Sequence, residues 1–254
     1  MSKESKRSAR EALAEERNRQ AAADKRKQRI INTVIVVVVA AVVVGIFVAV
    51  QNSRTKGPAT ATLPATVTEN GGPVTFGDGP VTVTIWEDFQ CPACKQFESV
   101  NSDYLEQAAL AGDITLAIQP LSFIDQNLGN TSSVLAANAF ACSMPSGDKA
   151  ALDFHQKIYA NQPKENPGNE AWDNATLIGW ANDSGVTGSD FESCVNDGTY
   201  NDWVQQVAAA GTTAGITGTP TVLVDGKKLT PTKDADYFTD PSVMRDAVAA
   251  AQKG

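Results

Sequence analysis

The most informative part of the chain is the nine-residue stretch Trp86-Glu87-Asp88-Phe89-Gln90-Cys91-Pro92-Ala93-Cys94, which ends in a Cys-x-x-Cys motif. Residues 81–86 are β-branched and aromatic, a pattern typical of a buried strand. From Cys94 to Leu110 the chain has no glycine or proline and is expected to form a helix. The two cysteines therefore lie where a strand turns into a helix, and Pro92 is near the position where a missing N–H costs nothing.

This position favours redox chemistry at the two cysteines. The free N–H groups and the positive dipole end of a helix N-terminus stabilise a thiolate, which is the nucleophile in disulfide exchange. Cys91 is placed to attack a disulfide, and Cys94, one helical turn later, is placed to resolve the mixed disulfide. We therefore expect Cys91 and Cys94 to be the catalytic residues.

Two other interpretations of the motif are weaker. A structural zinc site needs four ligands, but the other cysteines, Cys142 and Cys194, are 52 residues apart and the chain has one histidine. We therefore expect no bound metal. A purely structural disulfide between Cys91 and Cys94 would close a very short loop and would restrain the unfolded chain little.

A second motif accompanies the first one. Thr219-Pro220 precedes the β-branched residues 221–224, and a long stretch with helical signals separates the two motifs. As a set, they resemble the thioredoxin superfamily, in particular the membrane-anchored DsbA-like thiol–disulfide oxidoreductases of Gram-positive and actinobacterial type. The resemblance covers about residues 73–252. It implies an α/β, thioredoxin-like fold with an inserted α-helical domain at about residues 126–214.

The resemblance also implies roles for single residues. In related proteins the proline before this strand is cis and packs beside the Cys-x-x-Cys motif, where free backbone groups hold an extended substrate peptide. Thr219 and Pro220, together with Pro92 and Ala93, are then the expected substrate-binding residues. The dipeptide Pro92-Ala93 departs from the Pro-His of the best-known members, and Ala93 adds neither a donor nor a charge beside Cys91.

Buried acids are a further point of comparison. Thioredoxin-like reductases often carry a buried acid six residues before the first cysteine, and Ile85 occupies that position here. Glu87 and Asp88 are the nearest acids, and either could accept the proton of Cys94, although strand-end residues that face solvent are the simpler interpretation. His155 is interpreted as a surface or packed helical histidine. No Ser/His/Asp set, phosphate loop or metal cluster is found, so no cofactor is expected.

The N-terminal part of the chain predicts a membrane anchor. Residues 1–29 hold ten basic and five acidic side chains and are expected to be a cytoplasmic tail. Residues 30–50 are free of charge and long enough to span a bilayer as a single transmembrane helix. A cleaved signal peptide is the competing interpretation, but its apolar part is shorter and is followed by a small-residue cleavage site. The excess of basic residues before the span places the N-terminus in the cytoplasm and the rest outside.

Residues 51–72 are rich in Thr, Ala, Pro and Gly and are predicted to be a linker. The domain that follows is acidic. The chain has 21 basic and 29 acidic residues, and ten of the basic and five of the acidic ones lie in residues 1–29, so the rest has a net charge of −13. Such a domain is a poor match for nucleic acid.

The pattern along residues 73–252 alternates between strand and helix signals. Strands are expected at 73–76, 81–87, 113–119, 221–224 and 228–230, and helices at 91–110, 132–141, 150–159, 175–181, 189–195, 200–210 and 242–251. The strands 81–87 and 113–119, which a helix separates, should be parallel. Cys142 and Cys194 fall in the helical region; two free thiols outside the cell would be a liability, so we interpret them as a structural disulfide. A second redox pair is the alternative.

We therefore expect an extracytoplasmic, membrane-anchored and monomeric enzyme that introduces disulfides into exported proteins. Its partners would be unfolded exported proteins with free thiols and, by resemblance, a quinone-linked membrane reoxidase of DsbB-like or vitamin-K-epoxide-reductase-like type. A disulfide isomerase or a dedicated reductase is the alternative enzyme, although residues 51–72 are too short for the dimerisation module that isomerases usually carry. A peptide-binding module or chaperone with structural cysteines only is the alternative of another class.

Overall fold

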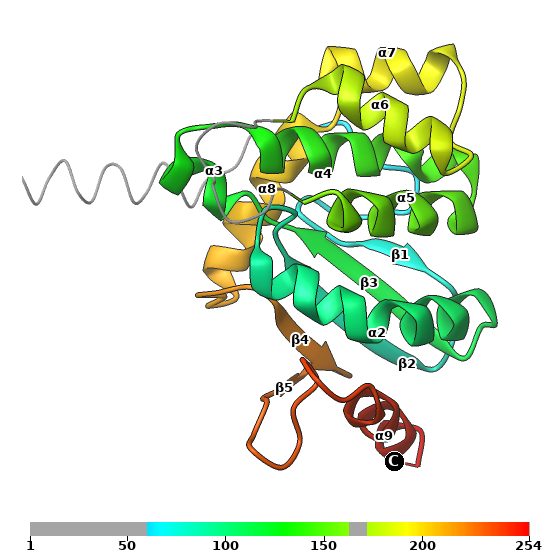
Figure 1. The fold of residues 1–254 in the computed structure, drawn as a ribbon, viewed down its shortest axis with the longest axis vertical. Coiled ribbons are helices and arrows are strands. Elements are labelled where there is room, and N and C mark those ends of the chain that lie inside the picture. Colours follow the sequence, from blue (N-terminus) through cyan, green and yellow to red (C-terminus); the bar gives the residue numbers. More distant parts are fainter. Residues whose placement is uncertain (1–59, 163–171, 254) are drawn as a thin grey trace, which may run out of the picture. The chain divides into compact units, whose positions relative to one another are not determined.

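The computed structural model describes residues 60–162 and 172–253 (Figure 1). The predicted cytoplasmic tail, the predicted anchor at 30–50 and residues 51–59 of the predicted linker lie outside these ranges. Among the residues that are described, no helix is long and apolar enough to cross a membrane. Residues 60–72 differ from the expected linker, because Val67 is 7% exposed and belongs to the hydrophobic core. The compact domain therefore begins before residue 73.

The centre of the domain is a sheet of five strands in the order β1-β3-β2-β4-β5. The strands are β1 (Val74–Phe76), β2 (Val81–Glu87), β3 (Ile114–Pro120), β4 (Thr221–Val224) and β5 (Lys227–Leu229). β2 and β3 pair in parallel, as expected from the helix between them, and the other neighbouring strands pair antiparallel. All five expected strands are present, with ends that differ by one residue at most.

Helices from outside the insertion pack against the sheet. α2 (Pro92–Leu110) connects β2 to β3 and lies across the front of the sheet in Figure 1. α9 (Ser242–Ala251) packs against β2 and β4 near the C-terminus. The connection from β2 through α2 to β3 fixes the N-terminus of α2 at the end of β2, which is where the Cys-x-x-Cys motif lies.

A helical insertion stands between β3 and β4. It consists of α3 (Phe123–Leu128), α4 (Ser132–Ser143), the short 3-10 helix η1 (Met144–Ser146), α5 (Asp148–Ala160), α6 (Asn174–Asp183), α7 (Ser189–Asp197) and α8 (Asn201–Thr213). In Figure 1 α4 to α7 lie together beyond the β1 edge of the sheet. The thioredoxin-like fold with a helical insertion is thus confirmed. Helix α3 was not predicted from the sequence, and the insertion begins a few residues before 126.

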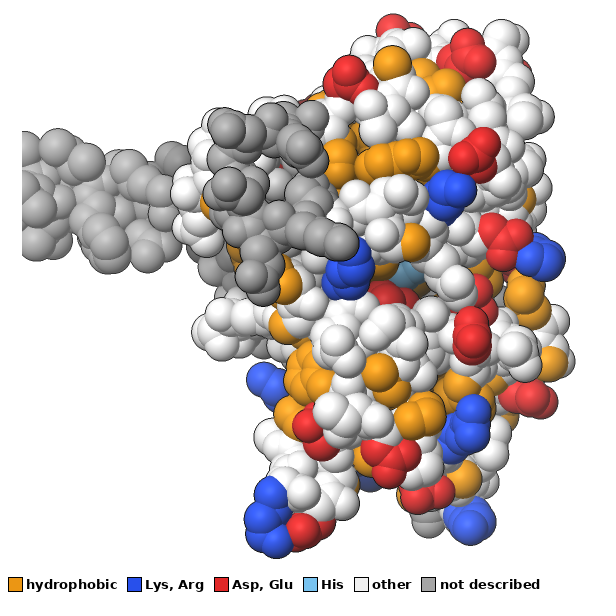
Figure 2. Space-filling view, viewed as in Figure 1, with side chains coloured by type: hydrophobic (Ala, Val, Ile, Leu, Met, Phe, Trp, Pro, Cys, Tyr) orange, Lys and Arg blue, Asp and Glu red, His pale blue; other side chains and the backbone are white. Residues whose placement is uncertain are grey.

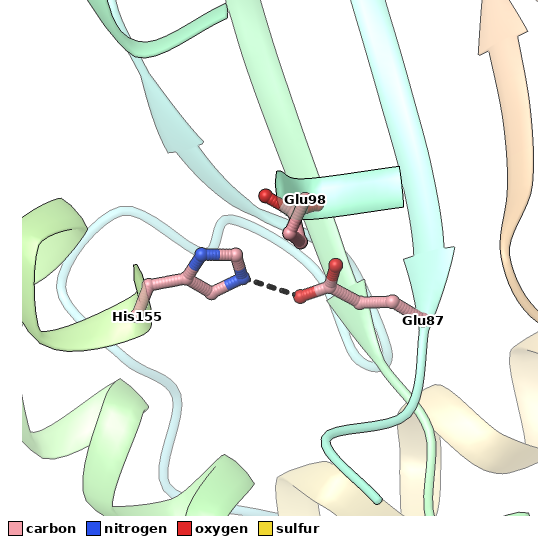
Figure 3. Close-up of side chains that lie close together, drawn as sticks. All are labelled: Glu87, Glu98 and His155. Carbon is pink, nitrogen blue, oxygen red and sulfur yellow. Dashed lines mark hydrogen bonds and ion pairs between the residues drawn. The ribbon is translucent and has the colours of Figure 1, made fainter. Parts of the chain in front are cut away.

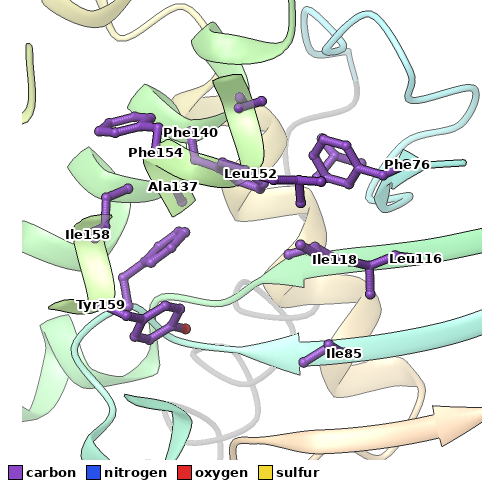
Figure 4. Close-up of a cluster of buried hydrophobic side chains, with 14 of the residues drawn as sticks. Phe76, Ile85, Leu116, Ile118, Ala137, Phe140, Leu152, Phe154, Ile158 and Tyr159 are labelled. Atoms are coloured by element: carbon purple, nitrogen blue, oxygen red, sulfur yellow. The ribbon is translucent and has the colours of Figure 1, made fainter. Parts of the chain in front are cut away.

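The insertion shares one hydrophobic core with the sheet (Figure 4). The side chains labelled there come from β1, β2 and β3 on one side and from α4 and α5 on the other: Phe76, Ile85, Leu116, Ile118, Ala137, Phe140, Leu152, Phe154, Ile158 and Tyr159. Each of these side chains is at most 2% exposed. Since burial of a large apolar side chain contributes about 1.5–3 kcal/mol, this shared core holds the insertion in a fixed position over the end of the sheet.

The insertion also contains a disulfide. Cys142 on α4 and Cys194 on α7 are joined, with a Cα–Cα distance of 5.9 Å. The bond connects two helices of the insertion and does not reach the sheet. The surface of the domain is acidic, and Figure 2 shows acidic side chains distributed from the insertion to the C-terminal helix.

Candidate functional site: the Cys-x-x-Cys motif and its surroundings

Cys91 and Cys94 lie at the N-terminus of α2, as the sequence predicts. Cys91 is the N-cap residue, with an extended backbone (φ −76°, ψ 118°), and Pro92 occupies the first turn. The backbone N–H of Cys94 points at the Cys91 sulfur, with an N···Sγ distance of 3.4 Å. Both cysteines are reduced. The first turn of the helix therefore presents donors to one sulfur atom only, that of Cys91.

The two thiols differ strongly in acidity. Hydrogen bonds from Cys94 and Thr219 and from the backbone of Ala93 outweigh desolvation and lower the pKa of Cys91 from 9.0 to about 6. Burial, followed by the interaction with Cys91 and the negative charge of Glu87, raises the pKa of Cys94 well above 9.0. At neutral pH Cys91 is thus a thiolate and Cys94 a thiol. Disulfide exchange needs this difference, because the thiolate is the nucleophile and the second thiol resolves the mixed disulfide.

Thr219 and Pro220 lie next to Cys91 although they are 128 and 129 residues away in sequence. The peptide bond between them is cis, as the resemblance implies. The Cys91 sulfur lies 3.4 Å from the carbonyl oxygen of Thr219. Pro92 and Ala93 are exposed, and Thr219 and Pro220 are half-buried. These four residues border the Cys91 sulfur, and Cys91 itself is 7% exposed.

The insertion anchors the loop that carries Cys91. Gln162, just after α5, is buried, and its Nε2 donates to the carbonyl oxygens of Phe89 (2.8 Å) and Cys91 (2.9 Å). In return, Nζ of Lys95 donates to the carbonyl oxygens of Ala160 (3.3 Å) and Gln162 (3.4 Å). These contacts fix the backbone around the nucleophile to the end of α5.

A second network fixes the same loop to the junction of α3 and α4. Oδ1 of Asp88 accepts from the Ser133 hydroxyl (2.6 Å), and its Oδ2 accepts from the backbone N–H of Ile124 (3.0 Å). Nε2 of Gln90 donates to Asp125 Oδ1 (2.7 Å) and to Ser133 Oγ (2.8 Å). Burial outweighs these hydrogen bonds and raises the pKa of Asp88 from 3.8 to about 6.

Glu87, which interacts with Cys94, belongs to a group of buried ionisable side chains (Figure 3). Nε2 of His155 on α5 lies 2.5 Å from Oε1 of Glu87 at the end of β2, and Glu98 on α2 points toward both. Desolvation alone would lower the pKa of His155, but the charges of Glu87 and Glu98 raise it to about 9. Burial and the nearby Glu87 raise the pKa of Glu98 well above 4.5. Among the described residues, these three form a group that could hold a metal ion.

A family model described as thioredoxin matches residues 70–240, which is more than half of the chain. The chain belongs to the thioredoxin family. This match includes the Cys-x-x-Cys motif, the whole insertion and the cis-proline loop, so both motifs stand in the context that the family gives them.

Individual proteins with a similar sequence or fold are named for disulfide bond formation or thiol–disulfide exchange. Disulfide bond formation protein D of Bacillus subtilis is 25% identical over 184 residues, which cover 70% of this chain and 75% of that protein. The fold is similar to that of BdbD from Bacillus subtilis (TM-score 0.57, 23% identity, 77% of this chain and 100% of that chain). It is also similar to MdbA, a thiol-disulfide oxidoreductase from Actinomyces oris (TM-score 0.59, 21% identity, 78% and 98%). The assignment of this thioredoxin-family chain to the thiol–disulfide oxidoreductases is thereby confirmed.

The structure brings the expected residues of this thioredoxin-family site together in one place. Cys91, Cys94, Pro92 and Ala93 lie at the start of α2, and Thr219 and Pro220 lie beside them. Cys142 and Cys194 lie apart from this group, in the insertion. Their bond agrees with the interpretation as a structural disulfide.

Two expectations about polar residues require correction. Glu87 and Asp88 do not face solvent, since both are fully buried. His155 is a packed helical histidine, one of the two expected alternatives, since it lies on α5 and is 2% exposed. The physical reason is the insertion, which covers the carboxyl end of β2 and supplies partners from α3, α4 and α5. Gln162, Ser133 and Asp125 were not recognised as part of the site, because no local pattern in the sequence links them to the cysteines.

Proposed function

We propose that this chain is a membrane-anchored, extracytoplasmic thiol–disulfide oxidoreductase that introduces disulfide bonds into exported proteins through Cys91 and Cys94. The observation that carries the proposal is the asymmetry of the pair. Cys91 is an N-cap thiolate with a pKa of about 6, and Cys94 is a buried thiol one turn later. A disulfide whose reduced form is stabilised as a thiolate is a strong oxidant.

The reaction begins with Cys91 and Cys94 joined as a disulfide. A substrate thiolate attacks the Cys91 sulfur, the bond between the two enzyme sulfurs breaks, and Cys94 leaves as a thiolate that takes up a proton. A second substrate thiolate then attacks the substrate sulfur of the mixed disulfide, and Cys91 leaves as a thiolate. Two electrons have moved from the substrate dithiol to the enzyme, which is left reduced. The low pKa of Cys91 makes it a good leaving group in this second step.

Substrate binding is assigned to the residues around Cys91. The exposed pair Pro92 and Ala93 and the half-buried pair Thr219 and Pro220 border the reactive sulfur. An extended peptide that adds to this edge would be held by main-chain hydrogen bonds, which fit many sequences. The proposed substrates are therefore unfolded exported proteins with free thiols.

Location and reoxidation rest on the sequence of the N-terminal part. The charge-free residues 30–50, preceded by ten basic side chains, support a single-pass anchor with a cytoplasmic N-terminus and an extracytoplasmic catalytic domain. Electrons would then pass from reduced Cys91 and Cys94 to a quinone-linked membrane protein of DsbB-like or vitamin-K-epoxide-reductase-like type. An anchor would keep the enzyme close to such a partner.

The experiment that tests the proposal is oxidative refolding of reduced, unfolded ribonuclease A with the disulfide form of the full chain in detergent. One disulfide should appear in the substrate for each enzyme pair reduced. A dedicated reductase would fail to oxidise the substrate, and a disulfide isomerase would act on scrambled ribonuclease A but poorly on the reduced form. A binding module would leave both forms unchanged, and each of these outcomes would contradict the proposal.

A further inference from the structure

The buried group Glu87, Glu98 and His155 has a feature that the exchange reaction does not explain. The three side chains come from β2, α2 and α5, and one ligand atom of each lies within 4.8 Å of the other two. Figure 3 shows the two carboxylates and the imidazole pointing toward a common space. Glu87 is fully buried, and Glu98 and His155 are 5% and 2% exposed.

Each member of this group has a polar atom without a hydrogen-bond partner among the described residues. These atoms are Oε2 of Glu87, Oε1 of Glu98 and Nδ1 of His155, and all three are buried. An unsatisfied buried polar atom costs about 1–3 kcal/mol, and in native proteins such atoms are usually explained by a water or an ion. Three of them in one place indicate that a ligand belongs there.

The donor atoms of the group favour a cation as that ligand, because carboxylates and imidazole are metal ligands that give up their protons when a metal ion binds. The group contains two carboxyl groups and one imidazole, and Glu106 is close enough to affect the charge of His155. The ammonium group of Lys95 donates to the backbone carbonyls of Ala160 and Gln162. Buried charges are normally paired or coordinated to metal ions.

One member of the group, Glu98, lines a cavity. A cavity of about 160 Å³ lies between α2 and α5, and Glu98 and Tyr159 are among its lining residues. Since one water takes up about 30 Å³ in the liquid, this space has room for a hydrated ion to enter and for a water ligand to remain. An entry path of this kind is one of the requirements for a real metal site.

We propose that Glu87, Glu98 and His155 bind a divalent transition-metal ion, best fitted by Zn²⁺, with a water from the cavity as the fourth ligand. Zinc accepts imidazole and carboxylate ligands at about 2.0–2.2 Å in a tetrahedron, which places neighbouring ligand atoms about 3.5 Å apart. The contact of 2.5 Å between His155 Nε2 and Glu87 Oε1 would open by about 1 Å when the metal replaces the shared proton. Ca²⁺ and Mg²⁺ prefer all-oxygen sites and fit this donor set less well.

The test must prevent the Cys91 and Cys94 thiols from binding the metal. We would therefore use the full chain in detergent with Cys91 and Cys94 joined as a disulfide, and titrate it with ZnCl₂ by calorimetry. We expect one zinc ion per chain, and the Glu98→Gln and His155→Gln variants should each bind at least about tenfold more weakly, since even the neighbours of metal ligands contribute that much. Co²⁺ in place of zinc should give the visible spectrum of a tetrahedral site without sulfur ligands.

The matched control is Asp153→Asn. Asp153 is an exposed acid two residues before His155 on the same helix, where it pairs with Lys149. This variant should bind zinc as the unaltered chain does. Circular dichroism shows whether each variant is folded, and if His155→Gln is not, the nearly isosteric Glu98→Gln decides the question. Absence of zinc binding by the oxidised chain, binding by Glu98→Gln with unchanged affinity, or tighter binding of Ca²⁺ than of Zn²⁺ would overturn the proposal.

Discussion

The chain contains two pairs of cysteines that differ in almost every physical respect. Cys91 and Cys94 are three positions apart and reduced, and they stand at the N-terminus of α2. Cys142 and Cys194 are 52 positions apart and joined in a disulfide. Cys142 is the penultimate residue of α4, and Cys194 lies in the second half of α7.

This difference shows how the position on a helix decides the chemistry of a cysteine. A helix N-terminus presents free N–H groups and positive potential, which stabilise a thiolate, whereas the C-terminal half presents the negative end of the dipole. Cys91 has the first environment, and Cys142 and Cys194 have the second. One pair is therefore suited to exchange and the other to holding two helices together.

The largest expected effect separates the two members of the first pair. Cys91→Ser should reduce substrate oxidation to the rate without enzyme, because the attacking and leaving sulfur is gone. Cys94→Ser should instead accumulate a mixed disulfide with the substrate through Cys91, because resolution is blocked. Non-reducing electrophoresis and peptide mass spectrometry would identify the trapped sulfur. A substrate trapped on Cys94 in the Cys91→Ser variant would reverse the assignment.

The second pair should affect stability and not activity. A loop of 52 residues predicts a loss of about 4 kcal/mol in the free energy of unfolding for the double variant Cys142→Ser with Cys194→Ser. The matched double variant is Cys91→Ser with Cys94→Ser. Its free energy of unfolding should be lower than that of the oxidised chain by about 2 kcal/mol at most, because the Cys91–Cys94 disulfide closes a very short loop. Urea unfolding would give both values. Loss of disulfide exchange in a folded Cys142 and Cys194 variant would contradict this division.

A third effect concerns Asp88, the buried acid three residues before Cys91. The pKa of Asp88 is about 6 in the folded chain and 3.8 in the reference state, so the protonated carboxyl favours folding. This contribution is fully present below pH 4 and is lost as the pH rises through 6, by about 3 kcal/mol in total. Asn imitates the protonated carboxyl, so the free energy of unfolding of the unaltered chain, minus that of Asp88→Asn, should fall by up to about 3 kcal/mol between pH 4 and 7.5.

Asp153→Asn is the control for this measurement, because Asp153 is an exposed acid on the surface of α5. The difference in the free energy of unfolding between the unaltered chain and Asp153→Asn should change little over the same pH range. A pH-independent difference for Asp88→Asn would show that this carboxyl is ionised in the folded protein throughout.

The smallest expected effect concerns Thr219. Its side chain is one of the groups that lower the pKa of Cys91. Thr219→Val removes the hydroxyl at constant shape and should raise that pKa by about one unit, since a hydrogen bond to a charged group contributes about 1.5 kcal/mol. Thr221→Val is the control, because its hydroxyl donates to the Gly218 carbonyl. The pH dependence of alkylation would give the pKa of Cys91 in each variant. An unchanged pKa in Thr219→Val would show that the Thr219 hydroxyl has no such role.

The sequence predicted the features that depend on neighbouring residues. The cis bond before β4, which the family resemblance implied, is present. The bounds of β2 and α9 and the position of Cys91 before α2 agree with the structure. Hydrophobic periodicity, helix signals and the two motifs carry this information locally.

The polar surroundings of the cysteines could not be predicted in the same way. Gln162 reaches Cys91 across 71 positions, and His155 reaches Glu87 across 68 positions. Such contacts depend on how the insertion folds back over the end of β2. The proximity of Glu87, Glu98 and His155 could not be predicted for the same reason, because these residues have no ligand spacing that a sequence pattern would reveal.

The most direct test of the account is the pH dependence of alkylation of the unaltered chain, followed separately at each cysteine by peptide mass spectrometry. After mild reduction, Cys91 should react with half-maximal rate near pH 6, and Cys94 should react only above pH 9. Cys142 and Cys194 should remain unmodified as a disulfide. Faster modification of Cys94 than of Cys91, or a half-maximal pH near 9 for Cys91, would contradict the claim that the N-terminus of α2 makes Cys91 the nucleophile.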